Sequence, residues 1–344
     1  MHDHSGFRER IDEVLVRLAD EEEQELLQLH AELSPLTEQL RRSLARGKRI
    51  RAAFLYWGWR AAGQPDCEGV IRAAAAMELV HAAACTHDDI IDDSRMRHGQ
   101  LTAHAAFAAA GRRSTALAMI LGDLLMGYAG HLFTTCGLPG GYLARTVPLW
   151  SMLLRETMAG EFLEVLRTDA PGDRVPQLAQ SLEVARYKTA KYTVERPLHL
   201  GATLGGAPRA LLEAFSGYGL PLGEAFQLRD DLLGTFGDPA TTGKSNLDDL
   251  RDGKPTALLA LTVAAADEDD RRLLAKLVGN PDLGQDEASS VRALMERCGA
   301  RRQVEDMIRE RISRARGALE YVPMPVEARS ALCELADTAA ERSL

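Results

Sequence analysis

The sequence has few aromatic residues, few runs of β-branched residues and no excess of positive charge. Aromatic residues make up only 5% of the 344 residues, while alanine and leucine are abundant. This composition favours an all-helical protein. The formal net charge of −9 leaves the chain without a general basic surface, so we expect no nucleic-acid partner.

Cysteine is also sparse, and long apolar runs are missing. The cysteines are odd in number and lack CxxC spacing, so we expect reduced thiols in a cytoplasmic protein rather than a zinc site or disulfides. Charges or glycines interrupt each apolar stretch before it reaches membrane-spanning length, and the polar start Met1-His2-Asp3-His4 does not resemble a signal peptide. We therefore expect no stable membrane insertion.

Apolar residues recur at helical spacing through most of the chain. We expect two helices within residues 7–45, separated at Pro35. Further helices are predicted over residues 52–63, 69–87, 102–111, 116–133, 147–168, 177–204, 211–233 and 256–266. No linker, low-complexity segment or short repeat divides the sequence, so we predict a single domain over residues 1–344.

One acidic stretch, His87 to Asp93, follows a long apolar run and contains four aspartates within six residues. On a helix, Asp88 and Asp92 project from the same face about 6 Å apart along the axis. Like charges this close repel one another unless a cation lies between them. An all-oxygen cluster suits a hard ion such as Mg²⁺. The alternative interpretation is a solvated acidic turn at a helix end.

A second pair of aspartates, Asp230-Asp231, ends another long apolar helix. If both helix ends open on the same end of a bundle, the carboxylates and nearby basic residues would bind Mg²⁺ and a diphosphate, with an apolar tunnel below for a hydrophobic tail. The pattern thus indicates a prenyl diphosphate substrate. The basic residues also have an interpretation without a binding site. Residues 46–51 would then be the start of a surface helix, and Lys188 and Lys191 would be surface lysines.

Several ordered motifs resemble those of the trans-isoprenyl diphosphate synthases, also called polyprenyl synthetases, from about Gly47 to Thr256. The resemblance, which is to geranylgeranyl diphosphate synthases in particular, implies an all-α, isoprenoid synthase-type antiparallel helical bundle around a deep central cavity, usually as a homodimer. The matching segments are Gly47-Lys48-Arg49-Ile50-Arg51, Glu78-Leu79-Val80-His81, the first aspartate motif with Arg97 and Gly99, Lys188-Thr189, Phe226-Gln227, Asp230-Asp231, Gly243-Lys244 and Gly253-Lys254-Pro255-Thr256.

The resemblance also implies the reaction, a head-to-tail condensation of isopentenyl diphosphate with an allylic diphosphate. Asp88 and Asp92 would hold two Mg²⁺ ions and Asp230 a third, with Asp89 and Asp231 as supporting carboxylates. Thr189 and Gln227 would steady the allylic carbocation with their dipoles. Arg97, Lys188 and Lys244 would bind the allylic diphosphate, with Lys254 near it. Lys48, Arg51, His81 and His98 would bind the diphosphate of isopentenyl diphosphate.

Two positions depart from the family pattern. Gly234 stands where the second motif usually has a third aspartate, and Asp238 in the following loop is a candidate to approach in its place. His98 stands where a second arginine is common. Because histidine carries less charge at neutral pH, we expect weaker or pH-dependent binding of isopentenyl diphosphate.

Product length depends on the tunnel. Ala83 and Ala84 stand where relatives that make shorter products tend to carry aromatic residues, so we expect a product longer than farnesyl diphosphate, with geranylgeranyl diphosphate first. The floor is then expected on the helix that carries Met119, Leu121 and Met126.

Three other functions are compatible with parts of the pattern. A class I terpene cyclase also uses an aspartate motif and Mg²⁺, but it needs no isopentenyl diphosphate pocket, and aromatic residues to guide a cyclising cation are scarce here. A metal phosphohydrolase is suggested by His87-Asp88, although the other histidines lack a ligand-like arrangement. A non-catalytic subunit of a heteromeric prenyl synthase is the third.

Overall fold

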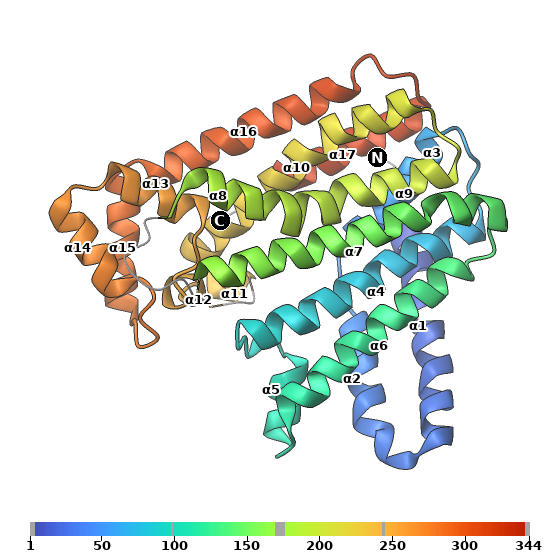
Figure 1. Cartoon of the computed structure of the whole chain (residues 1–344), viewed down its shortest axis with the longest axis horizontal. Helices are drawn as coiled ribbons and strands as arrows, with labels where there is room; N and C mark the ends of the chain where they lie inside the picture. The colour runs from blue at the N-terminus through green and yellow to red at the C-terminus, as the bar shows by residue number, and fades with distance from the viewer. Residues whose placement is uncertain (1–3, 98, 169–175, 243–244, 341–344) are drawn as a thin grey trace. The chain divides into compact units, whose positions relative to one another are not determined.

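The computed structural model describes residues 4–97, 99–168, 176–242 and 245–340 (Figure 1). These residues are almost entirely helical, which confirms the predicted all-α bundle. The chain forms two compact units, and neither unit is continuous in sequence. The first contains most residues up to Val147 together with Pro197–Ala207 and Met324–Ala331, and the second contains most of the rest. The single domain and the central cavity stay predictions.

The first unit begins with a long helix and a short 3-10 turn. Pro35 does not separate the two N-terminal helices as predicted, because it lies in the first turn of α2, where its missing N–H is not needed. The break comes instead at His30. The elements of this unit are α1 (His4–Leu29), η1 (Ala31–Leu33), α2 (Ser34–Leu44), α3 (Ile50–Ala61), α4 (Glu68–Ile91), β1 (Met96–Arg97), β2 (Gln100–Leu101), α5 (Ala103–Ala109), α6 (Ser114–Thr134), the start of α7 (Gly140–Thr168) and α9 (Arg196–Leu204).

Helix α4 is the centre of the first unit, and α6, α3 and α1 all pack against it (Figure 1). Its run of alanines at Ala73–Ala76 is fully buried, since small side chains allow neighbouring helices to approach closely. Helices α3 and α9 also meet at close range. A side chain at Gly201 would start 1.8 Å from the carbonyl oxygen of Leu55. Helix α4, which ends in the first aspartate motif, is therefore enclosed by neighbouring helices.

Helix α6 differs from the sequence expectation in one respect. Among the described residues, it is the helix that has the length and hydropathy of a membrane span. In the structure, its residues Leu121 and Leu125 are fully buried within the first unit. Asp123 on the same helix is exposed and lies 3.5 Å from Nε2 of His87. The apolar character of α6 thus serves, at least on this face, to pack against α4.

The second unit is also helical, with one unusual segment. Residues Ala185–Glu195 (η2) form a π-helix, which the sequence pattern did not indicate. The elements of this unit are the remainder of α7, α8 (Leu178–Val184), η2, α10 (Arg209–Phe236), α11 (Pro239–Thr242), α12 (Asp248–Arg251), α13 (Ala257–Ala265), α14 (Glu268–Leu277), α15 (Gln285–Arg297), α16 (Ala300–Leu319) and most of α17 (Val326–Ala340).

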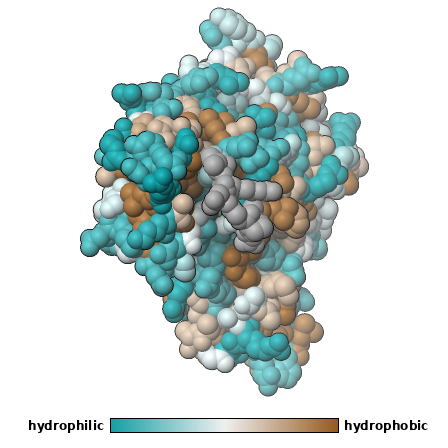
Figure 2. Space-filling view, turned by 60° about the vertical axis from the view of Figure 1, so that its left-hand side comes forward, coloured by the Kyte–Doolittle hydropathy of each residue, from teal (hydrophilic) through white to brown (hydrophobic). Residues whose placement is uncertain are grey.

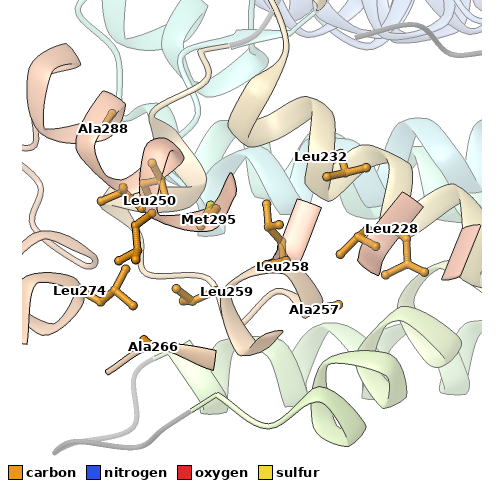
Figure 3. Close-up of a cluster of buried hydrophobic side chains, with 14 of the residues drawn as sticks. Leu228, Leu232, Leu250, Ala257, Leu258, Leu259, Ala266, Leu274, Ala288 and Met295 are labelled. Carbon is orange, nitrogen blue, oxygen red and sulfur yellow. The ribbon is translucent and has the colours of Figure 1, made fainter. Parts of the chain in front are cut away.

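Helix α10 is the centre of the second unit, and η2 and α16 pack along it. Near the end of α10, a buried apolar cluster joins this helix to the C-terminal helices (Figure 3). Leu228 and Leu232 come from α10, Leu250 from α12 and Leu258 from α13, and all are almost completely buried. This cluster fixes the short helix α12 and the loop after it beside the end of α10.

The visible face in Figure 2 is mostly hydrophilic, with hydrophobic residues interspersed among the polar ones. All five cysteines lie within the described residues, and all are free thiols, as expected from their scattered spacing.

Candidate active site

The first aspartate motif lies at the C-terminal end of α4, in the first unit. Asp89 is buried and Asp88 is partly exposed, while Asp92 caps the helix, its N–H bonded to the carbonyl of Asp88. Arg97, from β1, bridges the first two carboxylates. Its Nη2 donates to Oδ2 of Asp88 at 2.9 Å, and its Nε donates to Oδ1 of Asp89 at 2.8 Å. Arg97, the predicted diphosphate ligand, thus offsets part of the negative charge of the motif.

The thiol of Cys85 lies among several predicted site residues of the first unit. Its Sγ is 3.5 Å from Nδ1 of His81, one helical turn earlier on α4. Burial raises the pKa of this thiol, and the charges of Arg97, Asp88 and Arg51 also act on it. Predicted site residues from α4 and from neighbouring segments therefore lie around Cys85. Sequence reasoning assigned no role to Cys85, although its spacing of four from His81 places the two on one face.

The basic segment before α3 is organised by Arg49, a residue given no separate role from the sequence. Arg49 has a left-handed backbone (φ 55°), and its side chain is buried. Its Nε donates to Asp12 at 2.7 Å and its Nη2 to the carbonyl of Leu44 at 2.6 Å, while Glu78 lies 3.8 Å from Nη1. Glu78 also accepts the N–H of Ala52. This network fixes the segment that carries Lys48, which is exposed, and Arg51, which is partly buried.

The second aspartate motif lies near the end of α10, in the second unit. Asp230 is exposed and Asp231 is buried. The hydroxyl of Thr189 donates to Oε1 of Gln227 at 2.5 Å, and Nε2 of Gln227 donates to Oδ1 of Asp231 at 2.8 Å. Burial raises the pKa of Asp231 to about 8; Asp249, Glu164 and Asp230 raise it further, while the bond from Gln227 lowers it. The two predicted cation-steadying residues, Thr189 and Gln227, are hydrogen-bonded to each other.

Lys188 is held by two glutamates that sequence reasoning missed. Its Nζ lies 2.9 Å from Oε2 of Glu161 and also contacts Glu164, both on α7. The sequence does contain a pattern that could have indicated them, because two glutamates three residues apart on one helix, directly after Gly160, share a face. The neighbouring Lys191 is not a surface lysine, because it is mostly buried and bonded to Glu156 at 2.9 Å.

Glycines allow α7 and α10 to approach the π-helix on both sides of Lys188 and Thr189. A side chain at Gly160 would start 2.4 Å from the backbone nitrogen of Lys188, and one at Gly223 would start 2.2 Å from Cα of Ala190. π-Helical turns are frequent at functional sites, where they change the direction of side chains. Here the π-helix presents Thr189 to Gln227.

The loop that contains Lys254 is fixed by its backbone. The N–H of Lys254 donates to the carbonyl of Asp249 at 3.1 Å, and the carbonyl of Pro255 accepts from Ser181 at 2.6 Å. Asp238, the candidate to replace a third aspartate, is exposed and accepts a bond from Thr241. Two predicted ligands, His98 and Lys244, lie outside the described residues.

The carboxylates suit a divalent cation that brings some of its own ligands. Among the residues that the structure describes, no three His, Cys, Asp or Glu side chains lie close enough together to hold a metal ion by themselves. Burial raises the pKa of Asp231 and the neighbouring carboxylates raise it further, so a bound cation would favour its ionised form. Mg²⁺ usually keeps several waters and binds one or two carboxylates together with substrate phosphates, so the residues fit this ion.

Comparison with known proteins decides the family. The family model for polyprenyl synthetases matches residues 34–296. The chain belongs to the polyprenyl synthetase family. It is a trans-prenyltransferase, an enzyme that elongates prenyl chains.

Relatives of this polyprenyl synthetase differ in the product that they are named for. The chain is 32% identical over 302 residues to a (2E,6E)-farnesyl diphosphate synthase of Mycobacterium tuberculosis, covering 86% of this chain and 80% of that one. It is 30% identical to a geranylfarnesyl diphosphate synthase of Aeropyrum pernix over 87% of this chain and 91% of the other.

A solved structure is similar over nearly the whole length. The geranylgeranyl pyrophosphate synthase of Corynebacterium glutamicum, complexed with isoprenyl diphosphate and magnesium, has a TM-score of 0.93 and 33% identity, covering 99% of this chain and 100% of the other. The isoprenoid synthase-type helical bundle implied by the resemblance is therefore confirmed. The assignment of individual site residues stays a prediction.

Proposed function

We propose that this polyprenyl synthetase joins isopentenyl diphosphate head-to-tail to an allylic prenyl diphosphate and releases a longer trans-polyprenyl diphosphate. The observation that carries the proposal is the hydrogen-bonded series from Thr189 through Gln227 to Asp231, with Lys188 as the neighbour of Thr189. It combines a dipole for a carbocation, a cation for a diphosphate and carboxylates for Mg²⁺. The Asp88–Arg97–Asp89 arrangement supports the same chemistry at the first motif.

The reaction begins when the bond between the allylic carbon and its diphosphate oxygen breaks, and the electron pair leaves with the diphosphate. Arg97, Lys188, Lys244 and Lys254 would counter the charge that develops on this leaving group. Mg²⁺, held by Asp88, Asp92 and Asp230 with three ions expected, would supply further positive charge to the diphosphate. Because the Thr189 hydroxyl donates to Gln227, its oxygen keeps its lone pairs for the allylic cation.

The second half of the reaction forms the new carbon–carbon bond. Lys48, Arg51, His81 and His98 would hold isopentenyl diphosphate so that its double bond attacks the allylic cation. The resulting cation loses a proton, and the released diphosphate is the acceptor that we propose. Water has to be excluded throughout, because it would quench the cation.

The test is incubation of the purified chain with isopentenyl diphosphate, Mg²⁺ and each of three allylic primers (dimethylallyl, geranyl and farnesyl diphosphate), followed by product sizing. We expect elongated products only when isopentenyl diphosphate and Mg²⁺ are both present. Cyclic products formed without isopentenyl diphosphate would instead indicate a terpene cyclase. No product from the purified chain alone, with activity restored by a partner, would indicate a non-catalytic subunit.

For the product length, we propose geranylgeranyl diphosphate. Ala83 is fully buried and Ala84 partly buried on α4. Each position would therefore place only a methyl group beside a bound prenyl chain. Ala84→Phe should shorten the product, and Ala108→Phe on the exposed side of α5 should leave it unchanged. Equal product lengths for both variants on chromatography would contradict this assignment. Of the expected floor residues on α6, Leu121 is fully buried and Met119 is 50% exposed, so Leu121 is the stronger candidate.

We propose that the enzyme is a cytoplasmic homodimer. Met158, Phe162 and Leu166 recur every four residues on α7 and are 41%, 65% and 53% exposed, which gives this helix an apolar stripe. A second copy of the chain is the partner that we expect there. Phe162→Glu should shift the sedimenting species toward the monomer, whereas Arg155→Glu on the same helix should not.

A further inference from the structure

Gly234 in α10 is the position where the second aspartate motif departs from its family pattern, and its space is already filled. A side chain at Gly234 would start 2.1 Å from Oδ2 of Asp249 and 3.1 Å from Cγ of the same residue. No β-carbon tolerates a contact this short, so residue 234 has to be glycine while Asp249 keeps this position. A carboxylate thus lies where the missing third aspartate would begin, and it comes from α12.

The position of Asp249 is fixed by hydrogen bonds between the end of α10 and the loop before α12. Arg292, from α15, donates from Nε to the carbonyl of Thr235 at 2.6 Å and from Nη2 to the carbonyl of Asn246 at 3.0 Å. The side chain of Asn246 donates in turn to the carbonyl of Gly237 at 3.0 Å. These bonds tie residue 237 directly, and residue 235 through Arg292, to residue 246, three positions before Asp249.

The same residue also connects the motif to a predicted diphosphate ligand. The backbone carbonyl of Asp249 accepts the N–H of Lys254, while its carboxylate lies against Gly234. On α10, Asp230 is one turn before Gly234 on the same face. The charges of Asp249 and Asp230 both act on the buried Asp231.

We propose that Asp249 supplies the third acidic side chain of the second motif, reaching from α12 the position that residue 234 leaves open. In this role its carboxylate is an oxygen ligand, direct or through water, for Mg²⁺ bound with a diphosphate. The inference rests on the proposed function. It replaces the expectation that Asp238 would approach, since Asp238 is exposed and bonded to Thr241.

The first test measures Mn²⁺ binding by electron paramagnetic resonance in the presence of inorganic pyrophosphate, without turnover. Asp249→Asn should weaken Mn²⁺ binding at least tenfold, because it removes one anionic ligand while keeping the shape. The matched control, Asp248→Asn, removes the same charge from the adjacent residue of α12 and should stay within twofold of wild type. Equal affinities for the two variants would overturn the inference.

The second test exchanges the carboxylate between the two positions. Gly234→Asp alone should lower Tm and Mn²⁺ binding, because two side chains then compete for one space. Asp249→Gly alone should lower Mn²⁺ binding. The double variant should recover at least part of both quantities, and a double variant no better than the poorer single variant would overturn the inference.

The two proposals fail in different ways. If wild-type protein neither binds Mn²⁺ with pyrophosphate nor elongates a prenyl chain, the proposed function itself is wrong. If wild-type protein does both and Asp249→Asn behaves as Asp248→Asn does, only the role of Asp249 is wrong.

Discussion

The two aspartate motifs look alike in sequence, but the protein balances their charge differently. At the end of α4, one guanidinium hydrogen-bonds to both Asp88 and Asp89. Near the end of α10, the charged groups that shift the pKa of the buried Asp231 are other carboxylates, Asp249, Glu164 and Asp230. Arg97 therefore offsets charge at the first motif without a ligand, whereas at the second motif ionisation of Asp231 is unfavourable and a bound cation would favour it.

The largest expected effect is on turnover. Asp88→Asn and Asp230→Asn should each lower the rate of isopentenyl diphosphate incorporation by about 10² to 10³, because each removes a proposed Mg²⁺ ligand that stabilises the leaving diphosphate. The control is Asp93→Asn, next to the first motif, where the side chain is 95% exposed. If either variant stays within tenfold of this control in a radiolabel assay, its motif does not have the role proposed for it.

A second prediction concerns stability at the first motif. Arg97→Ala should destabilise the folded protein by about 3 kcal/mol, because it removes the guanidinium that balances the charge of the buried Asp89. Arg95→Ala, two residues earlier and exposed, should change the free energy of unfolding by less than about 0.5 kcal/mol. Urea denaturation compares the two variants. Equal midpoints would mean that Arg97 does not balance the charge of the motif.

A third prediction uses the raised pKa of Asp231. The folded metal-free protein keeps this carboxyl protonated up to about pH 8, whereas the unfolded chain releases the proton near pH 4. The folded state thus binds more protons between these values, so its stability is highest below about pH 4 for this group and is lost as pH rises toward 8. Asp231→Asn should flatten this decline and raise Tm at pH 8 relative to wild type.

The measurement for Asp231 is thermal unfolding from pH 5 to pH 8 in chelator, repeated with Mg²⁺ and pyrophosphate. The ligands should also flatten the wild-type decline, since they stabilise the ionised carboxylates. The exposed Asp238→Asn serves as control and should keep the wild-type slope. A slope unchanged in Asp231→Asn would show that the second motif is as well compensated as the first.

The smallest expected effect is at His98. If this residue binds isopentenyl diphosphate, its imidazole loses positive charge as pH rises from 6 to 8, and KM for isopentenyl diphosphate should rise by about two- to fivefold. His98→Arg should remove this dependence while KM for the allylic primer stays unchanged. A KM that does not depend on pH in the wild type would contradict the assignment.

Sequence reasoning predicted the helices well because their apolar spacing is regular, and it failed where tertiary contacts decide the outcome. A proline such as Pro35 suits either a helix break or the first turn of a helix, and the sequence alone does not distinguish the two. The π-helix at η2 depends on the close approach that Gly160 and Gly223 permit. That approach involves residues from three separate segments, which no local pattern reports.

The candidate site was predicted through its family motifs, but not its supporting residues. Thr189 and Gln227 are hydrogen-bonded to each other, while their proposed role stays a prediction. Glu161, Glu164, Cys85 and Asp249 were missed because their roles depend on which side chains meet in space. The sequence places Arg49 in the basic segment from residue 46 to residue 51, whereas its burial and left-handed backbone make it a structural residue.

The hydrogen bond from Arg49 to Asp12 links the Lys48–Arg51 segment to a helix outside the part of the chain that the family model matches. Asp12 belongs to α1, which precedes the stretch from residue 34 to residue 296 that the family model covers. A chain trimmed to that stretch would retain every motif residue yet lose the carboxylate that anchors the Lys48–Arg51 segment from outside. Helix α1 thus helps to position the segment that carries Lys48 and Arg51, the residues proposed to bind isopentenyl diphosphate.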